Sequence, residues 1–189
     1  SRITLTDFRN HAETVLDHPQ GLNLLIGANG AGKTNVLEAL SLLAPGRGLR
    51  RAQLSEMARK GGTGGFTVGA SLAGDGDVRL GSFVDPNSPA RRHLRVNGAD
   101  ASASTLGEWL SVAWLTPAMD GLFTAPASER RRYLDRLALA LDPSHASIAA
   151  RYEKALRERN RLLADLRTPA PQWLDAIEAQ MAAAGAGLA

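Results

Sequence analysis

The segment GANGAGKT, residues 27–34, carries the residue types and spacing in this chain that are best suited to chemistry. A glycine, four further residues, a glycine and a lysine followed by threonine form the phosphate-loop pattern. The glycines let backbone N–H groups turn towards an anion, and the N-terminus of the following helix adds positive partial charge. Lys33 can reach the β- and γ-phosphates, and the Thr34 hydroxyl can ligate Mg²⁺. The pattern predicts a loop that binds a nucleotide polyphosphate.

Hydrolysis of a bound nucleotide requires further groups that this segment lacks. An acidic residue at a strand end must hold the metal, another group must position water, and positive charge must stabilise the transition state. Two apolar runs end in aspartate, at Asp85 and Asp142. Each aspartate precedes a proline, so we interpret Asp142 as a helix end and Asp85 as the end of a hairpin segment. The catalytic assignment is therefore limited to Lys33 and Thr34.

Two clusters of arginines are candidates for binding DNA phosphates. Arg47, Arg50 and Arg51 follow the phosphate-loop helix, and residues 130–132 are three consecutive arginines that open a later helix. A solvated helix face is the more frequent explanation of such a charge run, so both interpretations stay open. The histidines show no metal-ligand spacing. They are His11, His18, His93 and His145.

Hydrophobic periodicity indicates the elements that position these residues. Residues 3–8 and 12–17 read as two strands that pair, and residues 21–27 read as a third strand leading into the glycine-rich turn. A helix with apolar residues at positions 36, 37, 40 and 43 follows the turn and ends before APGRG. Residues 63–100 read as short antiparallel strands, with Asn97-Gly98 as a hairpin turn. Beyond residue 127, helices are expected over 128–141, over 144–166 and from Trp173 onward.

Composition limits the class of protein. The chain has 189 residues, 44% of them hydrophobic, and a formal net charge of +3. It contains 19 arginines but only three lysines, and no cysteine. No apolar run approaches the roughly 20 residues of a membrane span, and no secretory signal is evident. We expect a cytoplasmic, non-membrane protein.

Several further segments, taken in order, resemble the RecF family of bacterial recombination mediators. They are LTDFRN, GANGAGKTNVLEALSLLAPGRGLR, RVNG, LTPAMDGLFTAPASERRRYLDRL and RYEKALRERNRLL. The phosphate loop alone is shared with thousands of unrelated proteins, whereas SERRRYLD and the "RN" of the long helix are far more particular to this family. The resemblance covers nearly the whole chain.

The resemblance implies an α/β P-loop fold of the ABC type, alongside Rad50 and the SMC proteins. Lobe I, with the phosphate loop and a mixed or antiparallel sheet, would span 1–117, and part of a helical lobe II would span 118–189. The chain would be the N-terminal half of the ATPase head, with the signature and the acidic strand end beyond residue 189. Matching residues assign the ATP site to Gly27, Ala28, Asn29, Gly30, Ala31, Gly32, Lys33, Thr34 and Asn35. Arg9 and Asn10 match a segment that lies near the nucleotide in related heads.

The family's biology supplies the remaining expectations. ATP and Mg²⁺ would join two heads into a homodimer that clamps double-stranded DNA at single-strand gaps. Recombination mediators of the RecO and RecR type would be partners, and RecA loading in gap repair, replication restart and the SOS response would be the outcome. Where the family often has an acidic residue after the proline, this chain has Ala118 after Pro117, so the metal or water contact expected there lacks its acidic residue. Asp120 could substitute only if the local turn differs.

Two other classes of function remain as alternatives. A degenerate head could bind DNA or a protein without an ATP cycle, using its arginine clusters. A small-molecule kinase could use the same loop, but it would have a parallel sheet, which the hairpins expected over 63–100 argue against.

Overall fold

The structure, a computed structural model, describes residues 1–19, 21–74, 76–164 and 171–188. The chain divides into two compact units, Ser1–Thr116 and Pro117–Ala189. The expected boundary, after residue 117, lies one residue from this division. The assignment of the two units to ATPase lobes stays a prediction.

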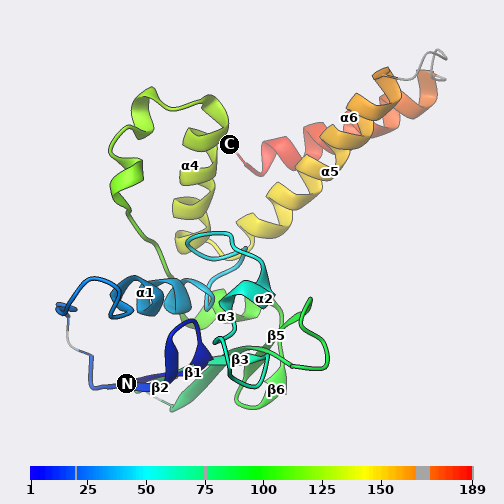
Figure 1. The fold of residues 1–189 in the computed structure, drawn as a ribbon. Coiled ribbons are helices and arrows are strands. Elements are labelled where there is room, and N and C mark those ends of the chain that lie inside the picture. The colour runs from blue at the N-terminus through cyan, green and yellow to red at the C-terminus, as the bar shows by residue number, and fades with distance from the viewer. Residues whose placement is uncertain (20, 75, 165–170, 189) are drawn as a thin grey trace. The chain divides into compact units, whose positions relative to one another are not determined.

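The first unit is built on a six-stranded sheet in the order β2-β1-β3-β4-β5-β6 (Figure 1). All of its strand pairs are antiparallel. The strands are β1 (Arg2–Phe8), β2 (His11–Asp17), β3 (Phe66–Leu72), β4 (Val78–Val84), β5 (Arg92–Val96) and β6 (Ala99–Asp100). The predicted pairing of the first two strands is confirmed, with Ile3 opposite Leu16. The predicted strands of the 63–100 region also form, and they join the first hairpin because β1 pairs with β3.

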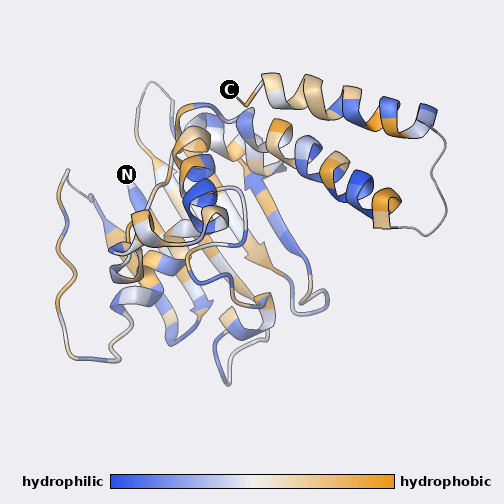
Figure 2. Ribbon diagram, turned by 90° about the horizontal axis from the view of Figure 1, so that it is seen from above, coloured by the Kyte–Doolittle hydropathy of each residue, from blue (hydrophilic) through white to orange (hydrophobic). Residues whose placement is uncertain are grey.

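Alternation of side chains explains why one face of this sheet is buried. Along β4 the residues Val78, Leu80, Ser82 and Val84 are buried, while the residues between them are more exposed. Figure 2 shows the same alternation of hydrophobic and hydrophilic positions along the strands. Asn97 and Gly98 both have positive φ, 50° and 86°, and they join β5 to β6 as the sequence predicts.

Three helices cover the buried face of the sheet (Figure 1). They are α1 (Lys33–Ser41), α2 (Leu54–Met57) and α3 (Ala103–Trp109). Their side chains join those of the strands in one core, in which Phe8 meets Phe66 edge to face with ring centroids 5.1 Å apart. The core therefore lies directly beneath the phosphate-loop helix. The sequence patterns did not predict α2 or α3, which have only 4 and 7 residues.

The strand predicted for residues 21–27 is wrong, because these residues form no strand. Figure 2 draws the segment as an extended chain separate from the sheet. Its alternating apolar residues Leu22, Leu24 and Ile26 are 92%, 85% and 83% exposed. The alternation is that of a strand, but a strand requires a hydrogen-bonded neighbour, and the described residues place none beside it.

The second unit consists of helices. Two 3₁₀ turns, Pro117–Met119 and Leu122–Thr124, precede α4 (Ala127–Leu141), α5 (His145–Ala164) and α6 (Pro171–Ala186). Helices α5 and α6 pack side by side (Figure 1) and are joined by an ion pair of 2.8 Å between Arg159 and Glu178. The three predicted helices are confirmed, except that residues 165 and 166 of the second lie outside the described part of the chain. No helix among the described residues is long and apolar enough to cross a membrane.

Candidate nucleotide-binding site

The phosphate loop takes the backbone conformation that its glycines permit. Gly27, Gly30 and Gly32 have φ values of 151°, 84° and 101°, a region that other residues rarely adopt. Gly32 is the left-handed residue that precedes α1, and the helix begins at Lys33. Asn35 N and Val36 N donate to Gly32 O, while the N–H groups of Lys33 and Thr34 have no partner among the described residues. These two N–H groups and the positive end of the helix dipole are therefore presented at the loop.

Gly32 also meets a steric requirement. A Cβ atom at this position would lie 2.5 Å from His11 Nε2 and 2.6 Å from Asn10 Oδ1. Gly32 is therefore fixed both by its φ and by the side chains packed against it, and no larger residue fits without displacing them. The positive φ values of its three glycines fit a loop that turns backbone N–H groups towards a bound polyphosphate.

The side chain of Lys33 lies over the start of the loop. Its Nζ atom donates to the carbonyl oxygens of Gly27, at 2.7 Å, and Ala28, at 2.9 Å. An ammonium group has three donors, so one remains for a phosphate oxygen. Thr34 is exposed at the start of α1, and within the described chain its hydroxyl has no hydrogen-bond partner, which suits a metal ligand.

Asn10 and His11, which follow β1, lie within hydrogen-bond distance of backbone carbonyls of the loop. Asn10 accepts a hydrogen bond of 2.8 Å from Asn35 Nδ2, and its own amide donates to Gly30 O at 3.4 Å. His11 Nε2 lies 3.2 Å from Gly32 O, and its Nδ1 lies 2.8 Å from the Thr14 hydroxyl. The structure thus brings Asn10 to the loop. It adds His11, which the sequence reasoning missed because a lone histidine carries no motif.

A buried carboxylate on α1 organises two arginines beside the loop. Glu38 is fully buried, and both of its oxygens accept from Arg9, at 2.7 and 2.9 Å. Arg50 donates to the same carboxylate at 2.8 Å, and to the side-chain oxygen of Asn35 at 2.8 Å. Arg9 also donates to Glu56 O at 2.8 Å. Glu38 therefore ties the end of β1 and the loop after α1 to the helix that carries Lys33.

Sequence reasoning missed Glu38 although a signal was present. A glutamate stands between apolar residues on a short helix that packs on a core, and an arginine-rich loop follows within 12 positions. A buried acid in such a place needs cationic partners. The guanidinium of Arg9 donates to Glu38 and to the backbone carbonyl of Glu56. A contact between Arg9 and the nucleotide stays a prediction.

The three arginines of the first cluster, Arg47, Arg50 and Arg51, have different surroundings in the structure. Arg50 turns inward to Glu38, whereas the guanidinium groups of Arg47 and Arg51 form no hydrogen bond or ion pair with any described residue. The second cluster lies on α4 in the other unit, where Arg130 donates to Ala125 O at 2.6 Å. DNA binding by Arg47, Arg50 and Arg51 stays a prediction.

Asp85 and Asp142, which the sequence analysis interprets as a hairpin end and a helix end, both lie in turns. Asp85 accepts from the backbone and the side chain of Asn87, and Asp142 follows the last residue of α4 and accepts from Ser144. The hydroxyl and backbone N–H of Ser144 hold the pKa of Asp142 below its usual value. No group of three or more His, Asp or Glu side chains suited to a metal occurs in the part of the chain that the structure describes.

Comparison with known proteins gives the family. The sequence is 54% identical to the DNA replication and repair protein RecF of Mesorhizobium japonicum over 192 aligned residues, which cover 100% of this chain. It is 50% identical to RecF of Rhizobium leguminosarum bv. trifolii over the same coverage. The chain belongs to the RecF family. It spans about half the length of these curated relatives, 50% and 51%. The AAA domain family matches residues 2–79.

Solved RecF structures share the fold. A structure of the recombination mediator RecF with ATPrS, in the RecFOR pathway, has a TM-score of 0.84 at 26% identity and covers 99% of this chain. RecF with ATP has a TM-score of 0.82 at 27% identity, and this chain covers 51% of each of the two. An SMC ATPase, at 19% identity and a TM-score of 0.53, is similar in fold alone. The predicted α/β P-loop fold of the ABC type is confirmed.

Proposed function

We propose that this chain is the nucleotide-binding N-terminal part of a RecF-type recombination mediator. The observation that carries the proposal is the loop itself: three glycines at positive φ, a left-handed Gly32 enclosed by His11 and Asn10, and Lys33 at the first helical position. The loop supports binding of the ATP phosphates. Thr34 would ligate the accompanying Mg²⁺, which would neutralise phosphate charge.

The side chains around the loop have distinct parts in this proposal. The free donor of Lys33 and the first N–H groups of α1 bind phosphate oxygens. Asn10, His11 and Asn35 hold the loop backbone in place, so that its shape exists before the nucleotide arrives. The carboxylate of Glu38 is already engaged by two arginines, so it neither holds a metal nor positions water.

In the whole protein, we propose that ATP joins two heads and that the dimer binds double-stranded DNA to assist RecA loading in gap repair. Partners of the RecO and RecR type follow from the same proposal, and the RecFOR pathway named for the solved relatives supports it. The acidic strand-end residue and the signature that turnover requires would come from outside these 189 residues.

The test of nucleotide binding is calorimetric titration of the chain with ATP and Mg²⁺. Lys33→Ala removes the cation from the loop, and we expect affinity to fall at least about tenfold because a charge-assisted hydrogen bond is lost. Lys60→Ala is the matched control, since Lys60 is exposed and has no hydrogen-bond partner among the described residues. Equal affinity in wild type and Lys33→Ala would contradict the assignment of Lys33.

A binding module without ATP turnover is a second candidate. The observation that favours it is that the carboxylate nearest the loop in sequence, Glu38, is committed to Arg9 and Arg50. ATP hydrolysis by a protein of the relatives' full length would exclude this candidate.

A further inference from the structure

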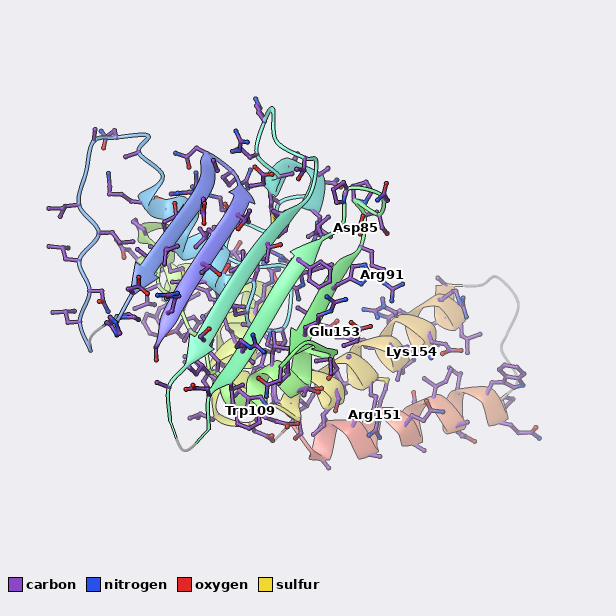
Figure 3. The ribbon with its side chains drawn as sticks, turned by 90° about the horizontal axis from the view of Figure 1, so that it is seen from below. Asp85, Arg91, Trp109, Arg151, Glu153 and Lys154 are labelled. Atoms are coloured by element: carbon purple, nitrogen blue, oxygen red, sulfur yellow. The ribbon has the colours of Figure 1, made fainter. Side chains whose placement is uncertain are left out.

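A cleft of about 460 Å³ lies in the first unit, away from the phosphate loop in sequence. One wall comes from the loop after α1 and the start of α2, residues 46–47 and 52–55. The other wall comes from residues 89, 90 and 92, where β4 is connected to β5. Asp85 and Arg91 mark this end of the sheet in Figure 3. A single water needs only about 10–15 Å³ on this measure of volume, so the cleft has room for a phosphate group.

Two arginines line this cleft, and neither side chain has a polar partner in the described part of the chain. The guanidinium groups of Arg47 and Arg92 make no hydrogen bond and no ion pair with any residue that the structure describes. Burial of the Arg92 side chain lowers its pKa, because water is removed and no anion replaces it. A partly buried cation without a counter-charge is costly, and an anion in the cleft would offset that cost.

The position of Arg92 on β5 explains why it faces the cleft. Side chains two positions apart share one face of a strand, and Leu94 and Val96 on the same face pack against the core. Arg92 therefore points towards the helix-covered side at the end of the strand. Arg95, three positions along, lies on the opposite face, where it pairs with Asp100 at 3.2 Å and stacks over Phe83.

The charge of the cleft selects its ligand. None of its lining residues is acidic, and Glu56, one residue beyond, accepts a hydrogen bond from Gln53 N in a capping box. Arg51 and Arg91 adjoin the lining segments in sequence, are exposed, and have no side-chain partner within the described residues. Cations that continue on both sides suit a chain of phosphates better than a single anion.

We propose that the cleft between residues 46–55 and 89–92 binds a phosphodiester of a nucleic-acid backbone, held by the guanidinium groups of Arg47 and Arg92. This inference rests on the DNA-binding part of the proposed function, and it assigns the contact to a specific site. Arg92 is the first residue of β5, a position to which the sequence analysis assigned no role in binding. Arg50, which is bound to Glu38, takes no part in this site.

The experiment is titration of a fluorescent 30-base-pair duplex with the 189-residue chain, read by anisotropy at several salt concentrations with and without ATP and Mg²⁺. We expect Arg47→Ala and Arg92→Ala each to weaken binding about tenfold at low salt, since each removes a charge-assisted hydrogen bond. Each should also reduce the slope of log affinity against log salt by about 1. Arg95→Ala removes the same charge from the opposite face of the same strand, and it should bind like wild type.

Three results would overturn the proposal. The first is duplex affinity in Arg47→Ala and Arg92→Ala equal to that of Arg95→Ala. The second is no duplex binding by the wild-type chain at low salt; calorimetry of ATP binding would then still report separately on the phosphate loop. The third is full displacement of the duplex by millimolar inorganic phosphate at matched ionic strength, which would mean that the cleft takes free phosphate. Thermal unfolding of each variant verifies that it is folded.

Discussion

Replacement of Glu38 by alanine tests whether the buried carboxylate holds the end of β1 and the loop after α1 to the phosphate-loop helix. The substitution removes three charge-assisted hydrogen bonds, two from Arg9 and one from Arg50. Breaking a buried ion pair by removing one partner costs about 3–5 kcal/mol. The side chains of Arg9 and Arg50 are 20% and 42% exposed, so both regain water when the carboxylate is lost. We therefore expect a loss at the lower end, about 3 kcal/mol, equivalent to a fall in Tm of about 10 °C.

The assay must report on the first unit alone, because the chain has two units and its unfolding need not be two-state. Hydrogen–deuterium exchange at increasing urea, read by mass spectrometry on peptides from β1 and β3, meets this need. Glu38→Gln keeps the shape and one acceptor oxygen, so we expect about half the loss. Glu13→Gln is the control, since Glu13 is exposed on β2 and has no hydrogen-bond partner in the described chain. A loss below about 1 kcal/mol in Glu38→Ala would refute the reasoning.

Two further predictions concern stability. Phe8→Ala should lower the free energy of unfolding of the first unit by about 3–5 kcal/mol, since Phe8 is fully buried against Phe66; a loss under about 1 kcal/mol in the same exchange assay would contradict this. Hydrogen bonds from Arg59 and from the backbone and hydroxyl of Thr63 hold the pKa of Asp7 below its usual value. The resulting stabilisation is present above the unfolded pKa of about 3.9 and is lost as pH falls through the lower folded value. Asp7→Asn should therefore be less stable than wild type at pH 6, with a difference that shrinks below about pH 3; urea midpoints at both pH values measure it, and an unchanged difference would contradict the assignment.

Local patterns sufficed for the elements whose partners are near in sequence. The hairpin at Asn97-Gly98 follows from two residues that tolerate positive φ, and the helices from residue 127 onward follow from periodic apolar positions. The phosphate loop likewise follows from its glycine spacing. In each case the residues that carry the sequence pattern are the same residues that form the predicted element.

Features that depend on distant partners could not be predicted. The strand expected at residues 21–27 failed because alternation identifies a strand-forming sequence but not the neighbour it requires. The separate roles of Arg47, Arg50 and Arg51 depend on the buried carboxylate of Glu38, and the role proposed for Arg92 depends on the meeting of two loops. The first arrangement leaves only a weak signal, a glutamate between apolar residues ahead of an arginine-rich loop, and the second leaves none in local spacing.

The pairing of β1 with β3 has a consequence for how the molecule folds. The hairpin β1–β2 and the meander β3–β6 need only short loops, so each can form early. The register that sets Arg2 opposite Ser71, however, closes a connection that contains the whole phosphate loop and α1. The entropy of that long closure must be overcome before the helix has a sheet to pack on. We therefore expect the nucleotide loop to take shape late, and a bound nucleotide to slow unfolding more than it speeds folding.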